Sequence, residues 1–203
     1  MKKIILALAS LGLLANCATT QTTQTTKTAN VEAPSEASQE FPTDLRRTTL
    51  IVDDIDESLK LYRDVLGFEV NYDTVVTMSG VALPAGNPGS EARLVLMNSN
   101  DSWVGWIGML QWLEPNALPR KPKTGKMGIG DMVMVFNTTE VDKQCDAAAK
   151  LPEITITTPK SESRYPSRNG GPPIVVHTCY MFDRDGYFLE INQLQDRESY
   201  NAD

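Results

Sequence analysis

The order of secondary-structure patterns repeats once along this chain, and this repeat constrains the fold more than any single motif. The first copy comprises strand-like runs at 46–52, 68–76, 92–97 and 106–113 with a helical pattern after the first of them. The second copy comprises strand-like runs at 131–136, 154–158, 174–181 and 187–193 with a helix at 141–150. The offset between the copies is about 85 residues. The sequence therefore predicts an α+β protein with two β-α-β-β-β modules, at about 45–114 and about 130–195.

Capping residues mark the start of both predicted helices. Asp54 stands three residues before Glu57, which is a capping-box arrangement, and Gly67 is a stop signal for the first helix. Thr138 or Thr139 is a candidate cap for the second helix. These signals support the division of each module into one strand, one helix and three further strands.

The first 17 residues have the layout of a secretory signal, with two lysines before an apolar run that is too short to span a membrane. The segment resembles the lipobox of bacterial lipoproteins, which implies lipidation of Cys17; the alternative is a plain signal peptide with an incidental cysteine. Ala18 after the cysteine favours the outer membrane in that sorting pattern. We therefore expect an exported lipoprotein of the cell envelope that faces the periplasm.

Residues 18–43 form a Thr/Gln/Ser-rich tract with few large apolar side chains, which predicts a disordered tether. The folded domain is expected at 44–196. The net charge of −7 argues against nucleic acid as a partner, because phosphate binding needs a clustered basic surface. Cys145 and Cys179 are too few for a disulfide framework, and whether they form one bridge stays open at this stage.

The closing strand places Glu190 in the middle of an apolar run, FDRDGYFLEINQ at 182–193. A carboxylate there needs a charged partner, hydrogen bonds or a metal. This run and VDDIDESLKLYRDVLGF at 52–68 are similar to the two signature motifs of the vicinal oxygen chelate superfamily, which contains glyoxalase I, extradiol dioxygenases and bleomycin-resistance proteins. The resemblance implies paired modules whose curled mixed sheets surround one cavity, and homodimers are common in that family.

The resemblance also implies four ligand places in the cavity, one on the first and one on the last strand of each module. These places fall on Arg47, Gln111, Asp131 and Glu190. A guanidinium cannot donate an electron pair to a metal, so Arg47 argues against a metal site. We expect a cavity without a cofactor that binds a small polar or anionic molecule, with Arg47 as its anchoring cation and the other three as polar partners.

Two alternatives remain open on the same residues. The first is an enzyme of glyoxalase or other lyase, epimerase or other isomerase, or dioxygenase type, with Mn, Fe, Ni or Zn held by Gln111, Asp131 and Glu190. The second is a structural salt bridge in the place of a lost site, which would leave only an interaction or scaffold role. His177 is the only histidine, and it joins Glu190 as a catalytic candidate if its face of the strand lines the cavity. The ligand place at Gln111 implies that this side chain points toward the cavity. Because side chains alternate along a strand, Trp106 and Trp112 are then expected on the opposite surface.

Overall fold

The computed structural model describes residues 43–167 and 170–196. The predicted signal segment, Cys17 and nearly all of the predicted tether lie outside these residues. No helix in the described ranges is both long and apolar enough to cross a membrane.

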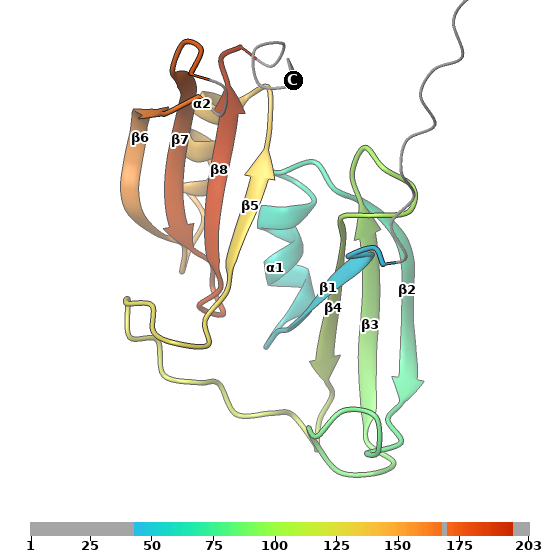
Figure 1. Ribbon diagram of the computed structural model, residues 1–203. Helices are drawn as coiled ribbons and strands as arrows, with labels where there is room; N and C mark the ends of the chain where they lie inside the picture. The colour runs from blue at the N-terminus through green and yellow to red at the C-terminus, as the bar shows by residue number, and fades with distance from the viewer. Residues whose placement is uncertain (1–42, 168–169, 197–203) are drawn as a thin grey trace, which may run out of the picture. The chain divides into compact units, whose positions relative to one another are not determined.

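Both modules have the predicted β-α-β-β-β order (Figure 1). The first module contains β1 (Arg47–Ile51), α1 (Ile55–Tyr62), β2 (Glu69–Thr77), β3 (Glu91–Asn98) and β4 (Trp106–Trp112). The second contains β5 (Val133–Asn137), α2 (Val141–Ala148), β6 (Thr155–Tyr165), β7 (Ile174–Phe182) and β8 (Phe188–Leu194). The strand orders β1-β4-β3-β2 and β5-β8-β7-β6 are the same in the two sheets, and β1–β4 and β5–β8 are the parallel pairs. The predicted fold class is confirmed.

One hydrophobic core runs through both modules on the helix-facing sides of the sheets. Leu50 and Met109 belong to it from the first sheet, and Leu189 and Ile191 from the second. The rings of Tyr62 in α1 and Phe136 in β5 meet edge-on with their centroids 6.4 Å apart. Apolar burial is the main favourable term in folding, so this shared core contributes to the association of the two modules.

A disulfide bond crosses the core of the second module. Cys145 in α2 is bonded to Cys179 in β7, and both residues are buried. The bond fixes α2 against its sheet and settles the question that the sequence left open.

Four predicted boundaries change in the structure. The first helix ends at Tyr62 and continues to Gly67 only as turns, and β6 runs on to Tyr165 through residues predicted as loop. Asp131 precedes β5 instead of belonging to it. Neither predicted threonine caps α2, whose N-cap residue is Glu140 without a side-chain cap bond.

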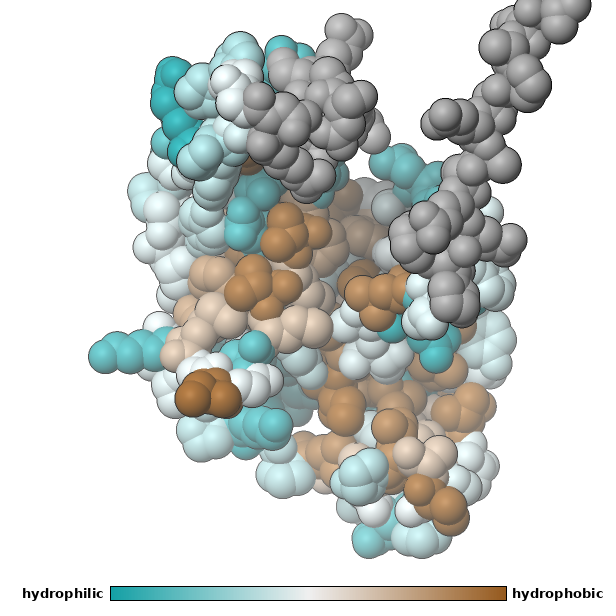
Figure 2. Space-filling model, viewed as in Figure 1, coloured by the Kyte–Doolittle hydropathy of each residue, from teal (hydrophilic) through white to brown (hydrophobic). Residues whose placement is uncertain are grey.

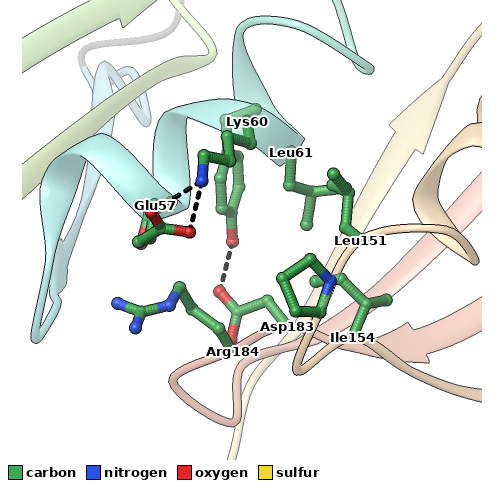
Figure 3. A pocket seen from close by; sticks show the side chains of 10 residues that line it. Glu57, Lys60, Leu61, Leu151, Ile154, Asp183 and Arg184 are labelled. Atoms are coloured by element: carbon green, nitrogen blue, oxygen red, sulfur yellow. Dashed lines mark hydrogen bonds and ion pairs between the residues drawn. The ribbon is translucent and has the colours of Figure 1, made fainter.

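The tight turn at 183–186, here called the closing turn, docks on α1 through a buried carboxylate. Asp183 is 1% exposed. Its Oδ2 accepts a hydrogen bond of 2.9 Å from the Tyr62 hydroxyl (Figure 3), and its Oδ1 accepts from the amides of Asp185 (2.9 Å) and Tyr187 (2.8 Å). Burial raises the pKa of Asp183 above its ordinary value, although these hydrogen bonds oppose the effect. The carboxylate therefore holds the shape of the turn and its contact with α1 at once.

The residues after Asp183 extend this contact to the start of the first module. The Tyr187 hydroxyl accepts from the Ile51 amide at 2.9 Å and donates to the Ile51 carbonyl at 3.0 Å, so it occupies the outer edge of β1. Asp185 accepts from the Asp53 amide at 3.1 Å. Arg184 forms an ion pair of 3.0 Å with Glu153. The closing turn thus joins one edge of the first module to the second.

Tyr62→Phe tests the buried hydrogen bond. The change leaves one acceptor of Asp183 without its donor in a buried place, and we expect it to lower the free energy of unfolding by about 1–3 kcal/mol. Urea denaturation measures this loss. Tyr72→Phe is the matched control because Tyr72 is 45% exposed, and its effect should stay within about 0.5 kcal/mol. Equal effects of the two changes would contradict the role of Asp183.

Candidate functional site

Each sheet has one face against its helix and one face away from it, here called the open face. In β1, Leu50 belongs to the core and Arg47, Thr49 and Ile51 lie on the open face, as alternation requires. The register pairs Leu50 with Met109 and Thr49 with Gly108. Because paired residues share a face, the open face of β4 carries Trp106, Gly108, Leu110 and Trp112.

Gln111 faces α1, so its predicted orientation toward the cavity is wrong. Its Oε1 accepts a hydrogen bond of 3.0 Å from the amide of Ile55, the first residue of α1. Gln193 does the same in the second module, where its Oε1 accepts from the Val141 amide at 3.2 Å. The first amides of a helix have no partner within the helix, which explains why a glutamine is placed under each one.

The two tryptophans predicted for the surface opposite the cavity lie instead on the open face of the first sheet. Trp112 is buried there, and its ring fills the space that a side chain at Gly86 would need. The loop around Gly86 therefore covers this end of the open face. Trp106 lies at the other end and is only partly buried.

Asp131 and His177 also lie away from the open faces. Asp131 is exposed in a turn, where its Oδ2 accepts from the Gly128 amide at 2.7 Å. His177 pairs with Gln193 across β7 and β8, which places it on the helix-facing side. Its side chain is 42% exposed, and its Nε2 lies 3.6 Å from Oε2 of Glu162. The structure thus separates both residues from Glu190.

Glu190 does lie on an open face, that of the second sheet. Its strand partners are Val135 in β5 and Tyr180 in β7. Its Oε1 accepts a hydrogen bond of 2.8 Å from Nδ2 of Asn192. Within the described residues it forms no ion pair with Arg47, so these two residues do not form the structural salt bridge that was one alternative for this place.

The internal repeat tests whether the four ligand places fit a metal. Gln111 and Gln193 are equivalent, as are the starts of β1 and β5, so the last-strand places fall on Gly108 and Glu190 and the first-strand places on Arg47 and Val133. A Cβ at position 108 would lie 2.8 Å from Oγ1 of Thr49 and 3.3 Å from Cδ of Arg47, so these side chains fill the place of a ligand.

Glu190 is then the only anionic donor among these four places. In the described part of the chain, no three histidine, cysteine, aspartate or glutamate residues are grouped to hold a metal ion. The residues present therefore do not fit the metal site that the resemblance implies, because divalent cations need several oxygen or nitrogen ligands.

A cleft of about 680 Å³ lies beside the outer edge of β5. One wall is formed by residues 132–139, and the other by residues 66–69, 98–100 and 105–107 with the start of β1. Arg47 is the one basic residue and Glu69 the one acidic residue among those that line it. Figure 2 shows apolar side chains, in brown, gathered across the middle of the face in view.

Arg47 differs from the other described arginines in having no partner. Five of them form ion pairs with carboxylates: Arg63, Arg93, Arg120, Arg164 and Arg184. Arg46 lies over the rings of Trp103 and Trp106, with its guanidinium carbon 4.3 Å and 5.3 Å from their centroids. Among the described residues, Arg47 forms neither a hydrogen bond nor an ion pair. Its charge is therefore free to interact with a ligand.

Trp106 lines the cleft, although it was predicted for the opposite surface. Its indole Nε1 is buried and has no hydrogen-bond partner among the described residues. Gly108, two residues later in the same strand, was the available signal, since a glycine inside a strand often marks a close approach of another group. Here that group is the Arg47 side chain.

The comparisons with known proteins agree with this architecture. The model of the Glyoxalase/Bleomycin resistance protein/Dioxygenase superfamily matches residues 44–191. A glyoxalase family protein from Bacillus cereus has a similar structure, with a TM-score of 0.61, 12% identity, and coverage of 80% of this chain and 100% of its own. Trypanothione-dependent glyoxalase I from Leishmania major has a TM-score of 0.45 and 16% identity, covering 74% of this chain and 86% of its own. No curated protein sequence matches the chain.

The family match covers well over half of the chain. The chain therefore belongs to the Glyoxalase/Bleomycin resistance protein/Dioxygenase superfamily.

Proposed function

We propose that this protein binds a small anionic molecule in the cleft beside β5, with Arg47 as the anchoring cation and without a resident metal. The free guanidinium of Arg47 is the observation that carries this proposal. A guanidinium presents paired N–H donors that match a carboxylate or phosphate. Trp106 lines the same cleft.

The size of the cleft supports the same class of ligand. A volume of about 680 Å³ lies within the usual range of about 300–1,000 Å³ for small-molecule pockets. Asn98, Asn100 and Gln144 are among its lining residues. The side chains of Asn98 and Gln144 already form hydrogen bonds within the protein, whereas Asn100 can offer its amide to the polar groups of a ligand. A small anion with further hydrogen-bonding groups is therefore the ligand class that we propose.

The metal-dependent enzyme remains the second candidate because the family contains such enzymes. It would need donors in addition to Glu190, and the equivalent places carry Arg47, Gly108 and Val133. We therefore favour binding over a lyase, isomerase or dioxygenase reaction at that place.

Arg47→Gln tests the proposal with inorganic phosphate and succinate as probes at constant ionic strength. We expect each probe to raise the melting temperature of the wild-type protein in a saturable way, because a ligand that binds only the folded state stabilises it. The change should abolish the rise. Arg164→Gln is the matched control, since Arg164 is an exposed arginine that pairs with Glu162. An equal rise in wild type and Arg47→Gln would overturn the proposal.

A metal assay of the same preparation addresses the second candidate. If stoichiometric Mn, Fe, Ni or Zn is present, and if its removal by a chelator lowers the melting temperature, the metal-free proposal is overturned.

We also propose that the protein is exported and anchored at the outer membrane through a lipid on Cys17, facing the periplasm. The signal-like N-terminal pattern supports export. The disulfide between Cys145 and Cys179 supports it independently, because such bonds persist mainly in oxidising compartments.

Labelling of bacterial cells with palmitate tests the anchor. The wild-type chain should incorporate the label and fractionate with membranes, whereas Cys17→Ser should lose the label and become soluble. Membrane association of the unlabelled variant would contradict a lipid anchor on this residue.

A further inference from the structure

Three aromatic rings lie in a row on the open face of the second sheet, beside Glu190. The rings of Phe182 and Phe188 meet at 63° with centroids 4.9 Å apart. Those of Phe188 and Tyr180 are stacked at 17° with centroids 6.1 Å apart. Tyr180 is the strand partner of Glu190. Phe188 precedes Glu190 by two residues in β8 and lies on the same face. The carboxylate therefore stands at the edge of an aromatic surface.

The charge of Glu190 acts on this aromatic surface. Burial raises the pKa of Tyr180, a hydrogen bond with Tyr165 adds to the shift, and the negative charge of Glu190 contributes as well. The carboxylate thus lies close enough to the Tyr180 hydroxyl to affect it, and the ring and the charge belong to one surface.

The same face contains hydrogen-bond acceptors that lack donors. Glu190 receives one hydrogen bond, at Oε1, and Oε2 receives none from the described residues. Oδ1 of Asn192 is buried without a partner. Thr178, the strand partner of Asn192, is 1% exposed, and its hydroxyl lowers the pKa of Tyr180 against the effect of burial. Buried acceptors of this kind are costly unless a donor reaches them.

No lysine or arginine among the described residues forms an ion pair with Glu190. Its charge is therefore compensated only by the Asn192 amide. A divalent metal would find one carboxylate and an amide, which is a poor ligand set. An organic cation would find a counter-charge, free acceptors for its N–H groups and π faces for its positive charge and apolar part.

We propose that this face binds an organic cation with N–H donors, such as a primary alkylammonium. The face, here called the Glu190 face, consists of Thr178, Tyr180, Phe182, Phe188, Glu190 and Asn192. The N–H groups bond to Glu190, and the alkyl chain lies over the rings. The site is distinct from the Arg47 cleft, although Val135 contributes to the cleft and is the strand partner of Glu190.

An NMR titration of the purified protein with butylammonium chloride tests the proposal, with total chloride held constant. We expect saturable shifts of the backbone amides of Tyr180, Glu190 and Asn192. Tetramethylammonium has the same charge but no N–H donor, and it should bind at least about fivefold more weakly. Equal binding of the two cations would overturn the role of the N–H donors.

Glu190→Gln keeps the size of the side chain and removes its charge. It should raise the dissociation constant for butylammonium at least about tenfold, because a charge-assisted hydrogen bond is lost. Glu162→Gln is the matched control. Glu162 lies on β6, where it pairs with His177 of the neighbouring strand β7. Binding unchanged in Glu190→Gln, or no saturable shift in wild type, would overturn the proposal.

Three further measurements separate the remaining outcomes. If Glu190→Gln unfolds the protein, Phe188→Leu serves instead, and it should weaken butylammonium binding by removing the central ring. Addition of MnCl₂ should not broaden the Glu190 and Asn192 amides at stoichiometric concentration; if it does, the face is a metal site and the proposal fails. The phosphate response that depends on Arg47 should persist in Glu190→Gln, so failure of one proposal is distinguishable from failure of the other.

Discussion

The buried carboxylate of Asp183 is the interaction on which the arrangement of the two modules depends. It accepts hydrogen bonds from the Tyr62 hydroxyl in α1 and from two amides of its own turn, so one side chain both shapes the closing turn and attaches it to the first module. Loss of the Tyr62 hydroxyl would leave Oδ2 of Asp183 as an unpaired buried acceptor, which is why the contact is specific. Because β8 begins directly after this turn, the same contact fixes where Glu190 lies. The hydroxyl of Tyr187 then takes the edge of β1 at Ile51.

The repeat makes an asymmetry of this interface visible. Ile51 and Asn137 are equivalent, since each ends the first strand of its module four residues before the helix. Tyr187 occupies the outer edge of β1 at Ile51, whereas the outer edge of β5 at Asn137 borders the cleft. The closed half of the interface supplies stability. The open half borders the cleft beside Arg47 in which we propose that a ligand binds.

The fold was predictable from the sequence because periodicity and two motifs are local signals that agreed with each other. The site was less predictable because the side of β4 on which Gln111 lies depends on a hydrogen-bond partner that is distant in the sequence. Gln111 turns toward α1 to satisfy the Ile55 amide, and this bond joins residues 56 positions apart. Asp131 was misplaced because the start of β5 was set two residues early. The roles of Asp183 and Tyr187 were also missed, since their partners lie in the other module.

Amide hydrogen exchange at Ile51 and Asn137 tests the asymmetric interface most directly. Alternate amides of an edge strand point outward: Val52 and Thr138 bond to the neighbouring strands, so the amides of Ile51 and Asn137 face the other way. The Ile51 amide is bonded to Tyr187 and should exchange slowly, close to the rate set by global unfolding. The Asn137 amide should exchange as fast as loop amides. Equal protection of the two amides would show that the second half of the interface is closed, and it would contradict this account.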